Sequence, residues 1–286
     1  MSTRVELAVA IPQTFPEGQI DRRRLREFLG RAEALGFGSA WVVEQILGGI
    51  PSLEPVELLA YAAAVTERLR LGAAVLLTAL RSPVHLAKSL ATLDHLSGGR
   101  LIVGVGLGGN AKIYPAFGIT AERRAARFAE SIRVMKLLWT EPRVTFTGTF
   151  WRLENAAMEP KPLQKPHLPV WFGAHHPNAL QRAAELGDGF MGAGSISTAQ
   201  FTEEVKTLRG LLAHRQARLH RGRSRPRAGR AAARRVVRRL LRPARAGRAS
   251  GRLGRRAGVS RRARAGDRRW GPPYPPQSGL RRARPP

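Results

Sequence analysis

One complete step of an alternating helix–strand fold is contained in residues 83–109, PVHLAKSLATLDHLSGGRLIVGVGLGG. Ser82-Pro83 is suited to open a helix that continues to Leu96, and the Ser97-Gly98-Gly99 turn is suited to end it. Leu101 to Val105 is then typical of a short buried strand, and a glycine-rich loop follows it. This stretch predicts a helix that packs against a strand.

The same alternation extends in both directions. We expect strands at 5–11, 39–43, 69–77, 168–172 and 190–191, helices at 21–35, 54–66, 120–138, 177–186 and from 197, and an inserted hairpin at 144–153. Six strands and six helices are therefore predicted before residue 213. Such a pattern forms a parallel sheet, either open and doubly wound or closed as an eightfold barrel. Periodicity alone leaves that choice open.

Positive charge is concentrated at the end of the chain. The 286 residues include 49 Lys plus Arg, 20 Asp plus Glu and no cysteine. Residues 1–213 carry 24 basic and 19 acidic side chains, a net charge of +5, whereas residues 214–286 carry 25 Arg and one acid, a net charge of +24. We therefore predict two parts, an incomplete barrel domain at 1–213 and a tail at 214–286.

The composition of the tail favours a frameshift. Arg, Ala, Gly and Pro fill 54 of its 73 positions, and Lys and Glu are absent. A GC-rich gene translated in the wrong frame would produce this mixture. The alternative is a natural arginine-rich arm that binds nucleic acid without sequence preference. High charge and few apolar residues predict disorder in either case.

Polar residues follow the second predicted strand. Glu44 and Gln45 come directly after residues 39–43, and Trp41 lies just before them. In a barrel they would lie at the carboxyl ends of the strands, where catalytic side chains collect. Glu44 can exchange protons near neutral pH, whereas Gln45 can only orient or hydrogen-bond a substrate. Pairing of Glu44 with a nearby arginine is an equally good interpretation.

Two charged residues flank the Ser97-Gly98-Gly99 turn. Asp94 precedes the turn and Arg100 follows it. Opposite charges at the end of a helix favour an ion pair across the turn. We expect this pair to be structural.

Two loops are candidate sites for an anion or a cofactor. Gly104-x-Gly106-x-x-Gly109 has the form of a dinucleotide fingerprint, but no helix begins within it, so a tight loop at a strand end explains it better. Residues 173–178, GAHHPN, lie between a strand and a helix whose N-terminal N–H groups could hold a phosphate. No histidine or carboxylate lies at ligand spacing to His175 or His176, so no metal site is predicted.

With these elements in order, the chain resembles the luciferase-like monooxygenase family, which includes bacterial luciferase and many coenzyme F420-dependent oxidoreductases. The resemblance rests on residues 83–109 and on three further stretches: FGSAWVVEQ at 37–45, TFTGTFWRLENAAMEPKPLQKPHLPVWFGA at 145–174 and ALQRAAELGDGF at 179–190. It covers residues 4 to about 213. It implies an α/β fold of the (β/α)8 TIM-barrel type, of which this chain holds about six βα units.

The resemblance also implies a cofactor, FMN or coenzyme F420, over the carboxyl ends of the strands. It assigns cofactor binding to Trp41, Ala74, Val75, Gly106, Gly173, Ala174 and His175. Among these, Ala74-Val75 resembles the family's non-proline cis peptide behind the cofactor ring, and the loop at 173–175 resembles its phosphate loop. Gln45 stands where luciferase has a catalytic histidine, so light emission is not predicted.

The implied function is an oxidoreductase for a small organic substrate, which acts by oxygen activation with reduced FMN or by hydride transfer with F420. A flavin or F420 reductase is an implied partner, and a homodimer is expected for a complete barrel. The N-terminus has no signal-peptide pattern and no apolar run approaches the roughly 20 residues of a membrane helix, which favours a cytoplasmic protein. Two alternatives stay open: a nucleic-acid-binding protein that acts through the tail, and a gene fragment without activity.

Overall fold

A computed structural model describes residues 5–192, 194 and 196–221. Its main sheet has six parallel strands in the order β1-β2-β3-β4-β7-β8. Their bounds are Ala8–Ala10 (β1), Ser39–Val42 (β2), Arg70–Ala73 (β3), Leu101–Val105 (β4), Val170–Gly173 (β7) and Gly189–Met191 (β8). A separate antiparallel hairpin is formed by β5 (Val144–Thr147) and β6 (Arg152–Ala156). The parallel sheet is as predicted, and the inserted hairpin forms, although its second strand lies at Arg152–Ala156 and so extends beyond the predicted residue 153.

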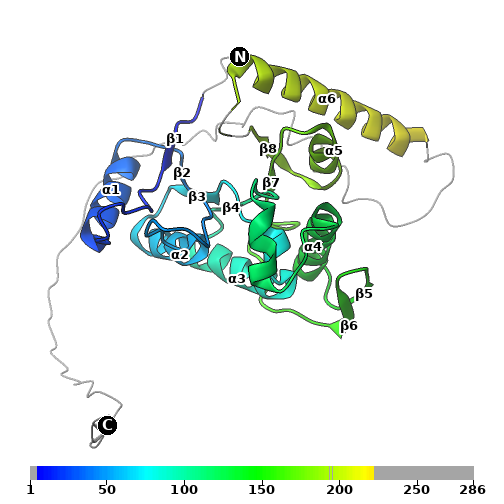
Figure 1. The fold of residues 1–286 in the computed structure, drawn as a ribbon, viewed down its shortest axis with the longest axis horizontal. Helices are drawn as coiled ribbons and strands as arrows, with labels where there is room; N and C mark the ends of the chain where they lie inside the picture. The colour runs from blue at the N-terminus through cyan, green and yellow to red at the C-terminus, as the bar shows by residue number, and fades with distance from the viewer. Residues whose placement is uncertain (1–4, 193, 195, 222–286) are drawn as a thin grey trace, which may run out of the picture. The chain divides into compact units, whose positions relative to one another are not determined.

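Helices alternate with the strands of the main sheet. Their bounds are Arg22–Ala34 (α1), Pro55–Val65 (α2), Pro83–Leu96 (α3), Arg124–Thr140 (α4), Pro177–Leu186 (α5) and Thr198–Arg221 (α6), and two 3₁₀ helices cover Thr78–Leu80 (η1) and Ala111–Phe117 (η2). Figure 1 shows α1 to α5 following the order of the strands, so that the curled sheet and its helices form a half-barrel. None of the described helices is long and apolar enough to cross a lipid bilayer.

The two faces of the sheet are lined by different side chains. Side chains that point from the strands toward the helices are buried in one apolar core, which includes Val42, Leu71, Val103 and Phe172. On the opposite, concave face the register places Trp41 beside Gly72 and Gly104 beside Trp171. The two tryptophan rings lie 5.6 Å apart between centroids and fill this part of the face.

The residues around 83–109 fold as the sequence predicts. The bounds of α3 and β4 are those expected, and the Ser82 hydroxyl accepts a hydrogen bond from the His85 N–H at 3.4 Å. The helix expected from residue 120 begins later, at Arg124, because the backbone of its N-cap Arg123 is left-handed (φ +55°) and not helical. The third strand is also shorter than expected and ends at Ala73.

The expected ion pair between Asp94 and Arg100 is wrong. Asp94 is fully buried and accepts hydrogen bonds from the backbone N–H and the side-chain amide of Gln164, at 3.0 and 2.8 Å. Arg100 instead donates to backbone carbonyls at 2.6–3.1 Å, those of Ala63, Thr66, Leu69 and Ser97. Gln164 is 70 residues from Asp94 in sequence, so local spacing could not show this contact.

The predicted boundary at residue 213 falls within a continuous helix. α6 begins at Thr198, where the Ser197 hydroxyl accepts a hydrogen bond from the Gln200 N–H at 3.2 Å, and it continues to Arg221. The predictions about a frameshifted, disordered or nucleic-acid-binding tail concern mainly residues 222–286, which lie outside the described part of the chain. The division of the chain at residue 213 therefore stays a prediction.

Candidate functional site

Predicted site residues from four neighbouring strands lie at one edge of the sheet. Glu44 and Gln45 follow β2, Ala74-Val75 follows β3, Gly106 follows β4, and 173–175 begins at the end of β7. These strands are parallel and adjacent in the sheet, so their carboxyl ends share an edge. Figure 1 shows β2, β3, β4 and β7 side by side. The sheet topology therefore gathers residues that are far apart in sequence.

Val75 packs between two of the predicted glycines. A Cβ on Gly106 would lie 2.5 Å from Val75 Cγ2, and a Cβ on Gly173 would lie 2.8 Å from Val75 Cγ1. Both glycines therefore leave space for the valine side chain. Ala74 is exposed, Val75 is half-buried, and the peptide bond between them is cis, as the family resemblance implied.

Trp41 lies deeper on the concave face than the other predicted positions. Its ring crosses the strand at Gly72, where a Cβ would lie 2.5 Å from the indole, and its Nε1 donates to the Ser39 hydroxyl at 2.9 Å. The register pairs Trp41 with Gly72, two residues before Ala74. Trp41 therefore belongs to the floor of the concave face. It does not lie among the loops at the carboxyl ends of the strands, where the other predicted residues are.

Glu44 is buried and paired. Its Oε1 accepts hydrogen bonds from Arg81 Nε and Nη2 at 3.0 and 2.7 Å, and its Oε2 accepts one from the Leu77 N–H at 2.5 Å. The carboxylate side chain is 0% exposed. Burial alone would lower the pKa of Arg81, but the carboxylates of Glu44 and Glu54 raise it above its ordinary value. The arginine-paired interpretation of Glu44 is thus the one that the geometry supports.

Arg81 connects Glu44 to a second carboxylate, that of Glu54. The other oxygen of Glu54 caps α2 and accepts hydrogen bonds from the N–H groups of Val56 and Glu57, at 2.6 and 3.2 Å. Neither Arg81 nor Glu54 was predicted as a member of this cluster. The available signal was local: Glu54 precedes a proline at a helix start, which is a capping position.

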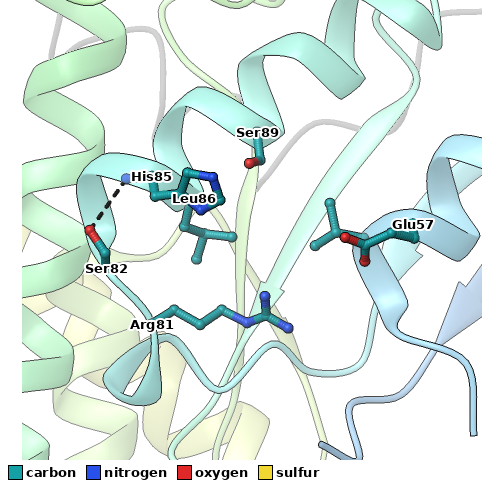
Figure 2. A pocket seen from close by; sticks show the side chains of 7 residues that line it. Glu57, Arg81, Ser82, His85, Leu86 and Ser89 are labelled. Carbon is teal, nitrogen blue, oxygen red and sulfur yellow. Dashed lines mark hydrogen bonds between the residues drawn. The ribbon is translucent and has the colours of Figure 1, made fainter. Parts of the chain in front are cut away.

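A small cavity lies on the helix side of Arg81. Figure 2 shows the arginine at its border, between residues of α2 and α3. The cavity measures about 190 Å³ and is lined by Val56, Glu57, Arg81, Ser82, His85, Leu86 and Ser89. It is smaller than the roughly 300–1,000 Å³ of most small-molecule sites, and its lining includes none of the predicted cofactor positions. It is therefore distinct from the candidate cofactor site on the concave face.

Gln45 is exposed beside Glu44, whose side chain is buried. Its side chain lies over Gly48, where a Cβ would collide with the amide nitrogen. The start of the same loop is held by Gln13, which was not among the predicted site residues. Its Oε1 accepts from the Val43 N–H at 2.6 Å, and its Nε2 donates to the Val43 carbonyl at 2.7 Å. Gln13 was detectable only as an amide residue that follows the first strand.

The predicted phosphate loop leads into α5, whose N-terminal residue is Pro177. His176 caps this helix: its Nδ1 accepts from the Asn178 N–H at 3.3 Å, and its carbonyl accepts from the N–H groups of Ala179 and Leu180. The backbone N–H groups of His175 and His176 donate to no other residue that the structure describes. An anion would therefore meet these loop N–H groups rather than the first turn of α5. His175 is exposed, whereas Ala174 is buried.

Curated relatives match only part of this chain. An uncharacterised protein of Mycobacterium tuberculosis is 43% identical over 123 residues, which are 43% of each chain. An F420-dependent glucose-6-phosphate dehydrogenase of Kineococcus radiotolerans is 35% identical over 178 residues, which cover 59% of this chain and 51% of that one. The chain thus spans about half the length of these curated relatives.

A solved structure, the monooxygenase RslO1 from Streptomyces bottropensis, matches with a TM-score of 0.66 and 32% identity, over 73% of this chain and 66% of that one. This likeness confirms the TIM-barrel-type fold class. The family model described as luciferase-like monooxygenase matches residues 5–274, which reaches further along the chain than the motifs recognised in the sequence. Because that match covers most of its length, the chain belongs to the luciferase-like monooxygenase family, as its motifs predicted.

Proposed function

We propose that the carboxyl-end loops of β3, β4 and β7 bind the cofactor of an oxidoreductase, either reduced FMN or coenzyme F420. The observation that carries this proposal is the packing of Val75 between Gly106 and Gly173. Because the flanking positions lack side chains, Ala74 and Val75 present an open apolar surface against which a planar ring fits. The F420-dependent relative and the monooxygenase RslO1 support the same class of chemistry.

The loop residues at the carboxyl ends of the strands have different roles in this proposal. The backbone N–H groups of His175 and His176, which donate to no other described residue, bind the cofactor phosphate as loop donors just before α5. Bound F420 would supply hydride transfer and bound reduced FMN would supply oxygen activation. The protein's part is to orient cofactor and substrate and to exclude water.

Glu44 acts in this proposal as a positioning residue. One of its oxygens accepts a hydrogen bond from Arg81 and the other accepts one from the Leu77 N–H. Glu44 therefore holds the loop after β2 against the loop after β3. Gln45 is exposed at the same edge and contacts the small organic substrate through its amide. A reductase partner and a homodimer belong to the same proposal.

Cofactor titration of the full chain tests the phosphate loop. Fluorescence quenching with FMN and, separately, with F420 should show binding of one of them, and His175→Asp should weaken it roughly tenfold or more, because a carboxylate then faces the phosphate. His85→Asp, an exposed histidine in the first turn of α3, is the matched control and should change affinity about twofold or less. His175 is preferable to the buried Ala174, where an aspartate would disturb folding.

Two results would contradict the proposal. Equal affinities for His175→Asp and His85→Asp would place the phosphate elsewhere on the protein. A folded full chain that binds neither FMN nor F420 would remove the cofactor site itself.

A further inference from the structure

Four large apolar side chains are exposed in and just before the loop between β2 and α2. The exposed fractions are 49% for Val43, 38% for Ile46, 54% for Leu47 and 51% for Ile50. We call these four residues the apolar rim. Single exposed apolar residues are ordinary on protein surfaces, but four within eight residues form a local cluster, which is typical of a ligand or partner surface.

The base of this loop is anchored at both ends. Gln13 binds both backbone groups of Val43 at the start of the loop. At its end, the Phe15 N–H donates to the Pro51 carbonyl at 2.9 Å, and the Leu53 N–H donates to the Gln13 carbonyl at 3.0 Å. The apolar rim is therefore presented from a fixed base, which lowers the ordering cost of binding a ligand.

The apolar rim is continuous with the proposed cofactor surface. The register pairs Val42 with Ala73, and the Ala74 N–H donates to the Val42 carbonyl at 2.7 Å. Val43, the residue that follows β2, thus lies beside the exposed Ala74 at the carboxyl edge of the sheet. A molecule seated on the apolar rim would lie next to the ring proposed to rest on Val75.

The charged cluster that holds the start of this loop does not suit a phosphate. Arg81, which follows β3 at this edge, is bound by two carboxylates, those of Glu44 and Glu54. Two carboxylates around one guanidinium leave an excess of negative charge, which repels a phosphorylated ligand.

From the exposure, anchoring, position and charge of this loop we infer that the apolar rim binds the apolar part of a neutral organic substrate. This inference rests on the proposed function, because it names the substrate class of the same site. It separates the chain from the glucose-6-phosphate dehydrogenase that it partly resembles, whose named substrate is a charged sugar phosphate.

Binding of Nile red to the full chain tests this inference. Ile46→Asp and Ile50→Asp should each weaken dye binding about tenfold, because a carboxylate replaces an apolar contact. Leu35→Asp is the matched control: Leu35 is 67% exposed at the end of α1, near the amino end of β2, and its substitution should change dye affinity about twofold or less. Octanol should displace the dye, whereas glucose 6-phosphate should not.

The outcomes separate this inference from the proposed function. Unchanged dye affinity in Ile46→Asp and Ile50→Asp would overturn the apolar substrate class, even where FMN or F420 binds. Displacement of the dye by glucose 6-phosphate would overturn it as well. A change from dimer to monomer in Ile46→Asp by analytical ultracentrifugation would overturn it too, since the apolar rim would then be an interface between copies. If the unsubstituted chain binds neither FMN nor F420, but Ile46→Asp and Ile50→Asp weaken dye binding as expected, only the proposed function is contradicted.

Discussion

The two edges of the parallel sheet differ most clearly around β3 and β4. At the amino edge, polar side chains are tied into hydrogen bonds with other segments: Arg100 with carbonyls around β3, and Asp94 with Gln164. At the carboxyl edge, Glu44 and Arg81 are paired in the same way, but glycines, an exposed amide and the apolar rim leave surface open beside them. Loops at the carboxyl ends of barrel strands carry function, whereas the amino ends carry stability. This half-barrel thus keeps its hydrogen-bonded edge apart from its open edge, which is the division that the proposed function requires.

A half-buried lysine shows how the amino edge is held. Lys136 of α4 donates to the Leu186 carbonyl at 2.7 Å and to Asp188 Oδ2 at 3.2 Å, and the same carboxylate oxygen accepts from the Val170 N–H at 3.0 Å. Burial lowers the pKa of Lys136, and Asp188 offsets part of that effect. One lysine and one aspartate thus connect α4 to the strands β7 and β8.

The largest effect is expected at the amino edge, from Arg100→Met. The substitution leaves several backbone carbonyls without their donor, so the free energy of unfolding should fall by roughly 2–4 kcal/mol in urea denaturation. Arg26→Met, an exposed arginine of α1, is the control and should have little effect. Equal stability of the two variants would break the comparison between the edges.

A smaller effect on stability is expected at the carboxyl edge, from Gly106→Ala. The new methyl group would meet Val75 Cγ2 at 2.5 Å, and displacing that side chain should cost about 1–3 kcal/mol of stability. The same shift should weaken cofactor binding, which fluorescence titration would measure. Gly109→Ala, where no atom lies within 4 Å of the added Cβ, should change neither quantity. Unaltered cofactor affinity in Gly106→Ala would remove Val75 from the proposed binding surface.

The smallest effect is a pH dependence at the amino edge. Burial, together with the Lys136 charge, lowers the pKa of His167 below its usual value, although Asp188 acts in the opposite direction. The unfolded chain then takes up this proton at a higher pH than the folded chain, so stability should fall as the pH drops below about 6.5. Urea unfolding at high and low pH should show a loss of about 1 kcal/mol or less that His167→Gln reduces. An identical pH dependence in both proteins would assign it to other groups.

Local sequence signals predicted most of the individual elements. Asp21 accepts a hydrogen bond from the Arg24 N–H as the N-cap of α1, and Pro55 and Pro83 occupy the first turns of α2 and α3. Capping and turn chemistry depend on neighbours within four residues, which a sequence displays directly. For the candidate site, the motifs located the strand ends and their loops, because each βα step carries its own glycines and polar residues.

Long-range partners were beyond those signals. The pairing of Glu44 with Arg81 joins residues 37 apart, Asp94 and Gln164 are 70 apart, and the contact of Trp41 with Trp171 crosses the sheet. Charge and spacing around the 97–99 turn instead suggested a local ion pair that does not form. Such choices depend on which segments the sheet brings together and on how each buried polar group finds a partner.

The alternation of strands and helices, the caps that begin the helices and the family of the chain could all be predicted from the sequence. The folded structure was needed to establish that Glu44 is bound by Arg81, that Val75 fills the space beside Gly106 and Gly173, and that Trp41 lies in the floor of the concave face. The interactions involved differ in range. Backbone propensity and capping act between neighbours in the chain, whereas burial, ion pairing and packing act between strands that only the folded sheet places side by side.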